Sequence, residues 1–345
     1  MKNKKKEYFR NCEWFENTFG FKETLFNIDK FFFPRESDLG IQLYSDILER
    51  TFLAGRFSTR NISSFHLNSR GKGTFSIIGK LNDYLYAYSI PEFCGATFQV
   101  NTNFNCLNNV CIDHKPEDGV TSYIYLNTTG AQAAISTAAS LVFRNYNLTL
   151  ASDNKINLIR NTSMPVQEGF SLLSQIIFVK DDVNFNFDCS DLNVYEVGVQ
   201  ENCQVVLTRH DSENLRFLPY EQIVHQVFVS SFDLSDDQQN NRKLMISIEP
   251  FLLEAEYKST ILAAWENSLK YPNYPGSKKC FLTMIGYETC NVPLEIVLKS
   301  IQSCQNLIIE SGLDVCLIAN DKNCFAYACN NLGEMVNQTS GRIVS

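Results

Sequence analysis

The chain has 345 residues and a formal net charge of −8 at pH 7, and 44% of its residues are hydrophobic. A sequence of this length can bury one large core or two modest ones. The acidic balance argues against nucleic acid as a partner, because neutralising phosphates needs clustered Lys and Arg. No stretch approaches about 18 apolar residues, so we expect no membrane partner.

The only basic run of the sequence lies at residues 2–6. It is not followed by an apolar segment of the length that a signal peptide needs. We therefore expect a cytoplasmic protein, or an effector that is delivered to a host cytosol by another route.

Twelve cysteines raise the question of metal binding. On spacing alone, zinc ligands could be drawn from Cys106, Cys111 and His114, or from Cys324 and Cys329. Most of the cysteines lie in apolar runs, where a reduced thiol behaves as a small buried hydrophobe. We predict no metal site, no disulfide framework and no cofactor.

The first 60 residues are rich in aromatic side chains. Two segments have the pattern of helices or turns and are separated by Pro34. We predict that residues 1–60 form a helical extension that packs on the core. Residues 51–65 and 71–81 then have the composition of strands with glycine-containing turns.

The next region organises the rest of the chain. Residues 95–107, GATFQVNTNFNCL, alternate apolar and polar side chains, which is typical of a half-buried strand. This strand ends in three amides, Asn101, Asn103 and Asn105. Their spacing of two places them on one face, so we expect them to line the edge where the strand ends.

A helix is predicted after these amides. In residues 123–146 the apolar side chains recur at three and four, and the helix should begin just after Gly130, with Thr128 and Thr129 as candidate N-caps. Free N–H groups at such a helix start can face an anion, and phosphate is the obvious one. The alternative is a packing helix, because an alanine-rich stripe also lets a helix lie close to a sheet.

The second half of the chain alternates strands and helices. His210 and Asp211 are adjacent on a strand and so point to opposite faces, which argues against a catalytic pair. Up to about residue 320 the alternation predicts an α/β fold with a mixed, largely buried sheet flanked by helices. The predicted elements are a helix at 166–175, strands at 194–210 and 244–251, a helix at 257–271, a strand at 280–291, a helix at 293–312, a strand at 313–320 and a polar tail at 331–345.

Several segments together resemble a known family. FGFKE, AGRFST, GATFQVNTNFNCL, TGAQAAI with FRNY, and FLTMIGYETCNVP occur in this order within residues 14–320. This combination resembles macro-domain-like proteins that bind ADP-ribose, among them bacterial effectors that remove it from modified ubiquitin. The resemblance implies a macro-domain-like α/β domain over residues 61–330 and a partner that is ADP-ribose or an ADP-ribosylated protein.

The resemblance also implies a binding site. The strand-end amides would lie near the distal ribose, two loops would clasp the phosphates, and an aromatic such as Tyr287 or Tyr146 would stack on the base. The implied ADP-ribose ligands are Asn103, Asn105, Thr129, Gly130, Ala131, Gly286, Tyr287 and Asn291.

The chain departs from the family pattern in both loops. Relatives have a glycine-rich loop where this chain has IGYETCN, which keeps only Gly286 and Asn291 of that pattern. They also have an Asp and a Gln in the stretch where this chain has Leu126, Asn127 and Thr129. These losses put catalysis in doubt more than binding.

Hydrolysis of an ADP-ribosyl bond requires a carboxylate that orients or deprotonates water. The acids near the loop are Asp113, Glu117 and Asp118, and we predict Asp118 in this role, with Asn105 as a second catalytic residue. The segment HKPEDG also has the composition of an ordinary exposed turn. Three functions therefore stay open: an ADP-ribosyl hydrolase, an ADP-ribose reader without chemistry, and an interaction scaffold.

Overall fold

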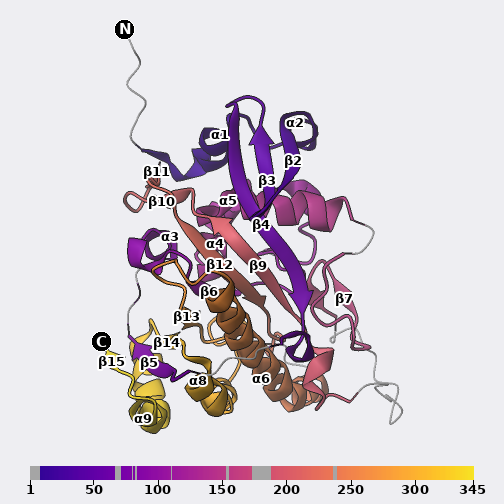
Figure 1. Ribbon diagram of the computed structural model, residues 1–345. Coiled ribbons are helices and arrows are strands. Elements are labelled where there is room, and N and C mark those ends of the chain that lie inside the picture. The colour runs from indigo at the N-terminus through magenta and orange to yellow at the C-terminus, as the bar shows by residue number, and fades with distance from the viewer. Residues whose placement is uncertain are drawn as a thin grey trace.

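The computed structural model describes residues 8–66, 71–79, 81, 84–109, 111–152, 155–172, 188–235 and 239–345. Across these residues the main feature is a mixed sheet of ten strands (Figure 1). In spatial order they are β15 (Ile343–Val344), β5 (Thr74–Ile78), β14 (Asp314–Ile318), β13 (Lys279–Leu282), β6 (Thr97–Asn101), β12 (Ile223–Val229), β9 (Val197–Gln204), β4 (Arg50–Arg60), β3 (Gly40–Ser45) and β2 (Phe32–Ser37).

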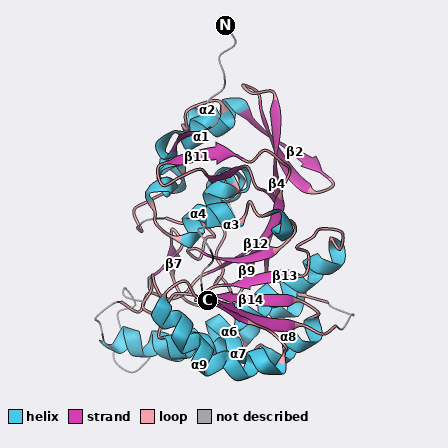
Figure 2. Ribbon diagram, turned by 90° about the vertical axis from the view of Figure 1, so that its left-hand side faces the viewer, coloured by secondary structure: helices cyan, strands magenta, loops and turns pink. Residues whose placement is uncertain are grey.

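The six strands from β15 to β12 run parallel to their neighbours, and the four strands from β9 to β2 continue the sheet antiparallel. Helices cover both faces (Figure 2). One face carries α6 (Gln239–Lys270), α7 (Leu294–Gln302), α8 (Gln305–Ser311) and α9 (Lys322–Gln338). The other face carries α3 (Tyr84–Ala87), α4 (Thr129–Ser136) and α5 (Ala138–Val142). The predicted fold class, a mixed sheet flanked by helices, is confirmed.

Strand β6 lies in the middle of this sheet and is buried on both faces. The prediction of a half-buried strand was therefore wrong. Its polar residue Gln99 is fully buried, and its amide is satisfied on both sides. Nε2 donates to Thr260 Oγ1 at 2.8 Å, and Oε1 accepts from the Thr283 N–H at 3.0 Å. Alternating polarity marks an exposed face only when no helix covers that face.

The N-terminal region is less helical than predicted. Besides the short helices α1 (Trp14–Phe19) and α2 (Leu25–Phe31), it contains β2, β3 and β4, which extend the main sheet through the pairing of β4 with β9. Pro34 lies within β2, where it is tolerated because β2 is the edge strand. The aromatic side chains of this region form a second core with the alanine stripe of α4 and α5. Packing is thus one role of that stripe.

In the second half of the chain, the strand predicted at residues 244–251 and the polar tail predicted at residues 331–345 were both wrong. The apolar run 244–251 belongs to α6 rather than to a strand. The buried residues Met245, Ile248 and Leu252 of this helix follow a helical spacing. A short apolar run does not distinguish a strand from a helix that is covered on most sides.

No helix of the described residues has the length and apolar character to cross a membrane.

The C-terminal residues are not a polar tail. Helix α9 continues to Gln338, and β15 then pairs with β5 at the end of the sheet. The polar residues lie on the exposed face of α9, while Cys324, Ala328 and Leu332 recur every four residues on its buried face. Polar composition alone concealed this amphipathic helix.

Candidate functional site

A cavity of about 770 Å³ opens beyond the carboxyl ends of β6, β12 and β13. Ligands of open α/β sheets bind at this edge, since the loops that follow parallel strands converge there. We call it the strand-end cavity. It is lined by residues in the segments 101–104, 108–109, 126–130, 169–171, 230–233 and 284–290, and by Met245. Four predicted site residues line it, namely Asn103, Thr129, Gly130 and Gly286.

The amides that end β6 do not all face this cavity. Asn101 and Asn103 line it, but the chain turns after β6, and Asn105 is 3% exposed and lies behind the lining. The Asn105 Oδ1 accepts from the Leu107 N–H at 3.1 Å. Asn108 takes its place in the lining, and its Nδ2 donates to Asn101 O at 3.0 Å. A spacing of two keeps residues on one face only while the strand continues.

The first turn of α4 closes one side of the cavity. As predicted, Thr128 is the N-cap, and its Oγ1 accepts from the Ala131 N–H at 3.3 Å. Ala131 is buried beneath this cap and does not line the cavity. Thr129 and Gly130 do line it, and their N–H groups are among those that no helical carbonyl can reach. The helix start therefore offers donors and the positive end of a dipole.

Gly130 is required by the close packing of this helix on the strand end. A Cβ atom at this position would lie 2.1 Å from Asn101 O and 2.4 Å from Asn108 Nδ2. Both distances are far inside van der Waals contact, so a side chain would push the helix away from the strand. The glycine thus sets the width of the cavity at this wall.

The loop after β13 forms the opposite side. Gly286 has φ +69°, and a Cβ there would lie 2.3 Å from Ser231 Oγ, so this glycine too sits where only glycine fits. Tyr287 and Asn291 do not line the cavity. Tyr287 packs against the main core, and Asn291 is exposed and adopts φ +53°.

Asp118 lies outside the cavity and is exposed. Its carboxylate caps its own turn by accepting from the Lys115 N–H at 2.8 Å. The following residues are held by Glu23, whose carboxylate accepts from the N–H groups of Val120 and Thr121 at 2.8 and 2.7 Å. This geometry matches the alternative interpretation of HKPEDG as a structured surface turn.

Two carboxylates that the sequence analysis did not select line the cavity, Asp233 and Glu288, and both are exposed. The Asp233 Oδ1 accepts from the Ser235 N–H at 2.9 Å and from its hydroxyl at 2.5 Å, which orients the carboxylate. Among the described lining residues there is no Lys, Arg or His. The position of Asp233, just after a buried strand, was the available signal.

A hairpin that was predicted as a helix supplies the remaining wall. Strands β7 (Val166–Gln167) and β8 (Phe170–Ser171) are joined by Glu168 and Gly169, both with positive φ, as in a type I′ turn. The part of the predicted helix at residues 173–175 lies outside the described residues. Gly169 O accepts from the Phe104 N–H at 2.9 Å, which docks the hairpin on the strand-end loop. Phe170 thereby joins the lining, whose other aromatic residue, Phe104, is buried.

The loop after β12 rests on two buried acids of α6. The Ser230 N–H donates to Glu256 Oε1 at 2.7 Å, and the Phe232 N–H donates to Glu249 Oε2 at 3.2 Å. Burial raises the pKa of Glu249 to about 8 and raises the pKa of Glu256 well above its usual value, partly offset in each by the backbone hydrogen bond. At neutral pH these acids are therefore mostly protonated, which lowers the cost of burying them.

The fold and the site together define a mixed α/β protein with an amide-lined cavity at the ends of its central strands. No protein-family model and no curated protein matches the chain.

Among solved structures, the chain is similar to the poly(ADP-ribose) glycohydrolase of Deinococcus radiodurans in complex with ADP-ribose. The TM-score is 0.42 at 8% identity, over 77% of this chain and 87% of that one. It is also similar to the poly(ADP-ribose) glycohydrolase of Thermomonospora curvata, with a TM-score of 0.41 at 8% identity, over 94% of this chain and 98% of that one. Similarity at this level does not establish a shared activity.

Proposed function

We propose that the strand-end cavity binds ADP-ribose. One observation carries the proposal: the first turn of α4, with Thr129 and Gly130, and the strand-end amides line a single cavity of about 770 Å³. Ligand cavities commonly measure about 300–1,000 Å³. The diphosphate lies at the helix start and at the Gly286 loop, where backbone N–H groups bind it without a basic side chain.

The amides and the aromatic ring bind the remaining parts of the ligand in this proposal. Asn101, Asn103 and Asn108 offer donors and acceptors to ribose hydroxyls, and the ring of Phe170 offers a face for the adenine base. The resemblance of the sequence to macro-domain-like proteins supports the same assignment.

We further propose that the protein hydrolyses the bond between ADP-ribose and a modified protein, with ubiquitin as one candidate target, as in the bacterial effector MavL. Water attacks the anomeric carbon of the distal ribose, the bond to the acceptor side chain breaks, and the acceptor leaves with a proton. Asp233 is the best placed base, because it lines the cavity and its carboxylate is oriented by the hydrogen bonds from Ser235 to Oδ1. Action in a cytosol, including that of a host, fits this role.

The alternative is a reader that binds ADP-ribose without hydrolysing it. The position of Asp118 outside the cavity favours this alternative, because the carboxylate that the sequence suggested for catalysis cannot reach a ligand there. Such a protein keeps the binding residues and releases no product.

Binding is tested first, by calorimetric titration of ADP-ribose. Phe170→Ala should weaken binding about tenfold, since base stacking on an aromatic ring contributes about 1–3 kcal/mol. The matched control is Gln167→Ala, because Gln167 pairs with Phe170 across the hairpin but lies outside the lining. The absence of binding at millimolar ADP-ribose, or equal loss in both variants, contradicts the proposal.

Catalysis is tested by the release of free ADP-ribose from an ADP-ribosylated protein. Asp233→Asn should lower the rate at least a hundredfold, in the range that a positioned general base contributes. Asp188→Asn is the control, because Asp188 is exposed and holds Ser190 through the same N–H and hydroxyl contacts away from the cavity. Binding without release by the wild-type protein supports the reader instead.

A further inference from the structure

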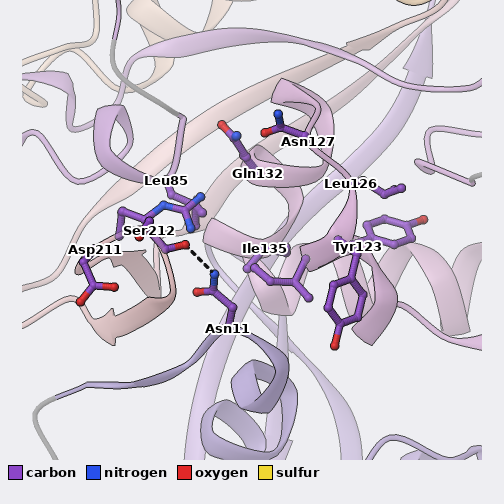
Figure 3. A pocket seen from close by; sticks show the side chains of 12 residues that line it. Asn11, Leu85, Tyr123, Leu126, Asn127, Gln132, Ile135, Asp211 and Ser212 are labelled. Carbon is purple, nitrogen blue, oxygen red and sulfur yellow. Dashed lines mark hydrogen bonds between the residues drawn. The ribbon is translucent and has the colours of Figure 1, made fainter.

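A second cavity, of about 550 Å³, lies on the other side of the segment that precedes α4 (Figure 3). We call it the side cavity. Leu126 and Asn127 line both cavities and form the wall between them. The rest of its lining comes from five places: Asn11, Leu85 of α3, residues 123–125, Gln132 and Ile135 of α4, and the segment 209–212 that leads from β10 (Leu207–Arg209) toward β11 (Asn214–Phe217).

The lining combines apolar side chains with amides. In the close view Ile135 lies near the centre, and Tyr123 and Leu126 lie to one side of it (Figure 3). The amides of Asn11, Asn127 and Gln132 lie around them. The ring of Tyr123 is fully buried. Flat aromatic heterocycles suit such a site, because their faces are apolar and their edges carry donors and acceptors.

The state of the amides points to a ligand with an acceptor. Asn11 Nδ2 donates to Ser212 O at 3.1 Å, which fixes the orientation of this amide. Its Oδ1 is buried, and no partner for it is found in the described part of the chain. Gln132 Oε1 accepts from the Tyr84 N–H at 3.1 Å, so its Nε2 remains to donate. The buried Asn11 Oδ1 is not accessible from the cavity, so of these groups the Gln132 Nε2 is the one that can bond to a ligand.

Charge and exposure narrow the class of ligand. Arg209 and Asp211 both line the cavity, so its charged side chains carry no net charge, which favours an uncharged ligand over an anion. Tyr125 also lines the cavity and is 72% exposed, so its ring can stack on a ligand at the mouth.

From these observations we propose that the side cavity is a second ligand site that binds a purine nucleoside. The base lies on Leu126, its edge bonds to the Gln132 Nε2, and Tyr125 stacks on its outer face. The cavity volume of about 550 Å³ is within the range of small-molecule sites. The proposal does not depend on ADP-ribose binding, because the two cavities share only their dividing wall.

Tyr123 connects the two sites physically. Tyr123 is buried at the side cavity, and its hydroxyl accepts from the N–H of Asn108, a residue of the strand-end cavity, at 3.0 Å. A nucleoside in the side cavity would therefore hold the dividing wall and the Asn108 loop in place. Linkage requires that any such effect on ADP-ribose affinity be matched by the reverse effect.

The test is calorimetric titration of adenosine into the full chain and two blocking variants. Ser212→Trp places a bulky ring in the side cavity from an exposed turn, and its control Glu213→Trp changes the next residue, which is exposed and outside the lining. Tyr125→Ala removes the stacking ring, and Tyr327→Ala, on α9, is its control for the loss of an exposed tyrosine.

We expect wild-type protein to bind adenosine, Ser212→Trp and Tyr125→Ala to weaken binding at least tenfold, and both controls to bind as the wild type does. No binding at millimolar adenosine overturns the proposal. Loss of adenosine binding in Phe170→Ala with full retention in Ser212→Trp and Tyr125→Ala also overturns it, since adenosine would then occupy the strand-end cavity.

Discussion

Two walls of the strand-end cavity hold their shape by different physical means. The α4 wall, formed by Thr129 and Gly130, packs backbone against backbone, with Gly130 seated on Asn101 O. The β12 wall, formed by residues 230–233, is suspended by its N–H groups from Glu249 and Glu256. The first arrangement tolerates no added atom, whereas the second depends on the protonation of two buried acids.

The comparison shows how one cavity combines a fixed side with a titratable side. Close backbone contact contains no group that titrates between pH 5 and 8, so the α4 wall should not respond to pH. The β12 wall should respond, because deprotonating a buried acid places an unpaired charge beneath the loop. Three experiments test this difference.

The largest effect is expected from Gly130→Ala. The added Cβ would meet Asn101 O at 2.1 Å, and the helix must move to relieve the clash, so we expect a loss of about 3 kcal/mol in the free energy of unfolding. Urea denaturation measures it. The control is Gly333→Ala in α9, where no atom lies within 4 Å of the new Cβ and the change should stabilise by about 0.5–1 kcal/mol. Equal changes in the free energy of unfolding for the two variants would show that the α4 wall can accommodate the added Cβ atom.

The second effect is a pH dependence of stability. The pKa of Glu249 in the folded chain is raised to about 8, so the folded state holds a proton that the unfolded state has released. The resulting stabilisation is complete below the unfolded pKa and is lost as pH rises through about 8. The free energy of unfolding should therefore fall by about 2 kcal/mol or more between about pH 5 and 8.

Glu249→Gln sharpens this prediction, because the amide keeps the acceptor for the Phe232 N–H and cannot ionise. Urea denaturation at several pH values should show a clearly flatter dependence for the variant. Lys299→Gln is the control, since its partner Glu295 is on the surface and the pair should contribute little. A variant curve parallel to that of the wild type would show that Glu249 does not control the β12 wall.

The smallest effect is expected from Thr128→Ala. Loss of the N-cap of α4 should cost about 1 kcal/mol in the free energy of unfolding and should also weaken ADP-ribose binding, because Thr128 lines the cavity. Thr24→Ala removes the equivalent cap of α2, whose Oγ1 accepts from the Asn27 N–H at 3.1 Å. It should cost similar stability and leave binding unchanged. If both variants bind ADP-ribose equally, the helix start is not part of the site.

Local features of the sequence predicted the α4 wall well. The N-cap Thr128 and the helix that follows depend on neighbours within four residues, so the pattern of side chains is sufficient to find them. Gly286 was also found, because a glycine after a buried strand marks a turn at the sheet edge. The hairpin that carries Phe170 was missed, since Glu168 and Gly169 form a two-residue turn within an apparently helical spacing.

Side-chain direction beyond the strand ends was not predictable in this way. Asn105 was expected beside Asn103, but the chain leaves the strand after Asn101 and turns Asn105 into the interior. Asp118 was expected at the site because it is near in sequence, and the structure commits it to the Lys115 turn. Asp233 and Phe170 reach the cavity from segments more than 50 residues from Asn105 and Asp118.

The sequence by itself determined which segments form helices and strands wherever short-range periodicity and capping decide, and it indicated that two strand ends carry loops suited to a ligand. Only the tertiary structure decided which loops meet, because β6, β12 and β13 become neighbours through hydrogen bonds between residues far apart in the chain. The same packing decided the burial of Gln99, Glu249 and Glu256, since α6, which carries the two acids, packs on the sheet over Gln99. Burial depends on what covers a residue, and no local pattern contains that information.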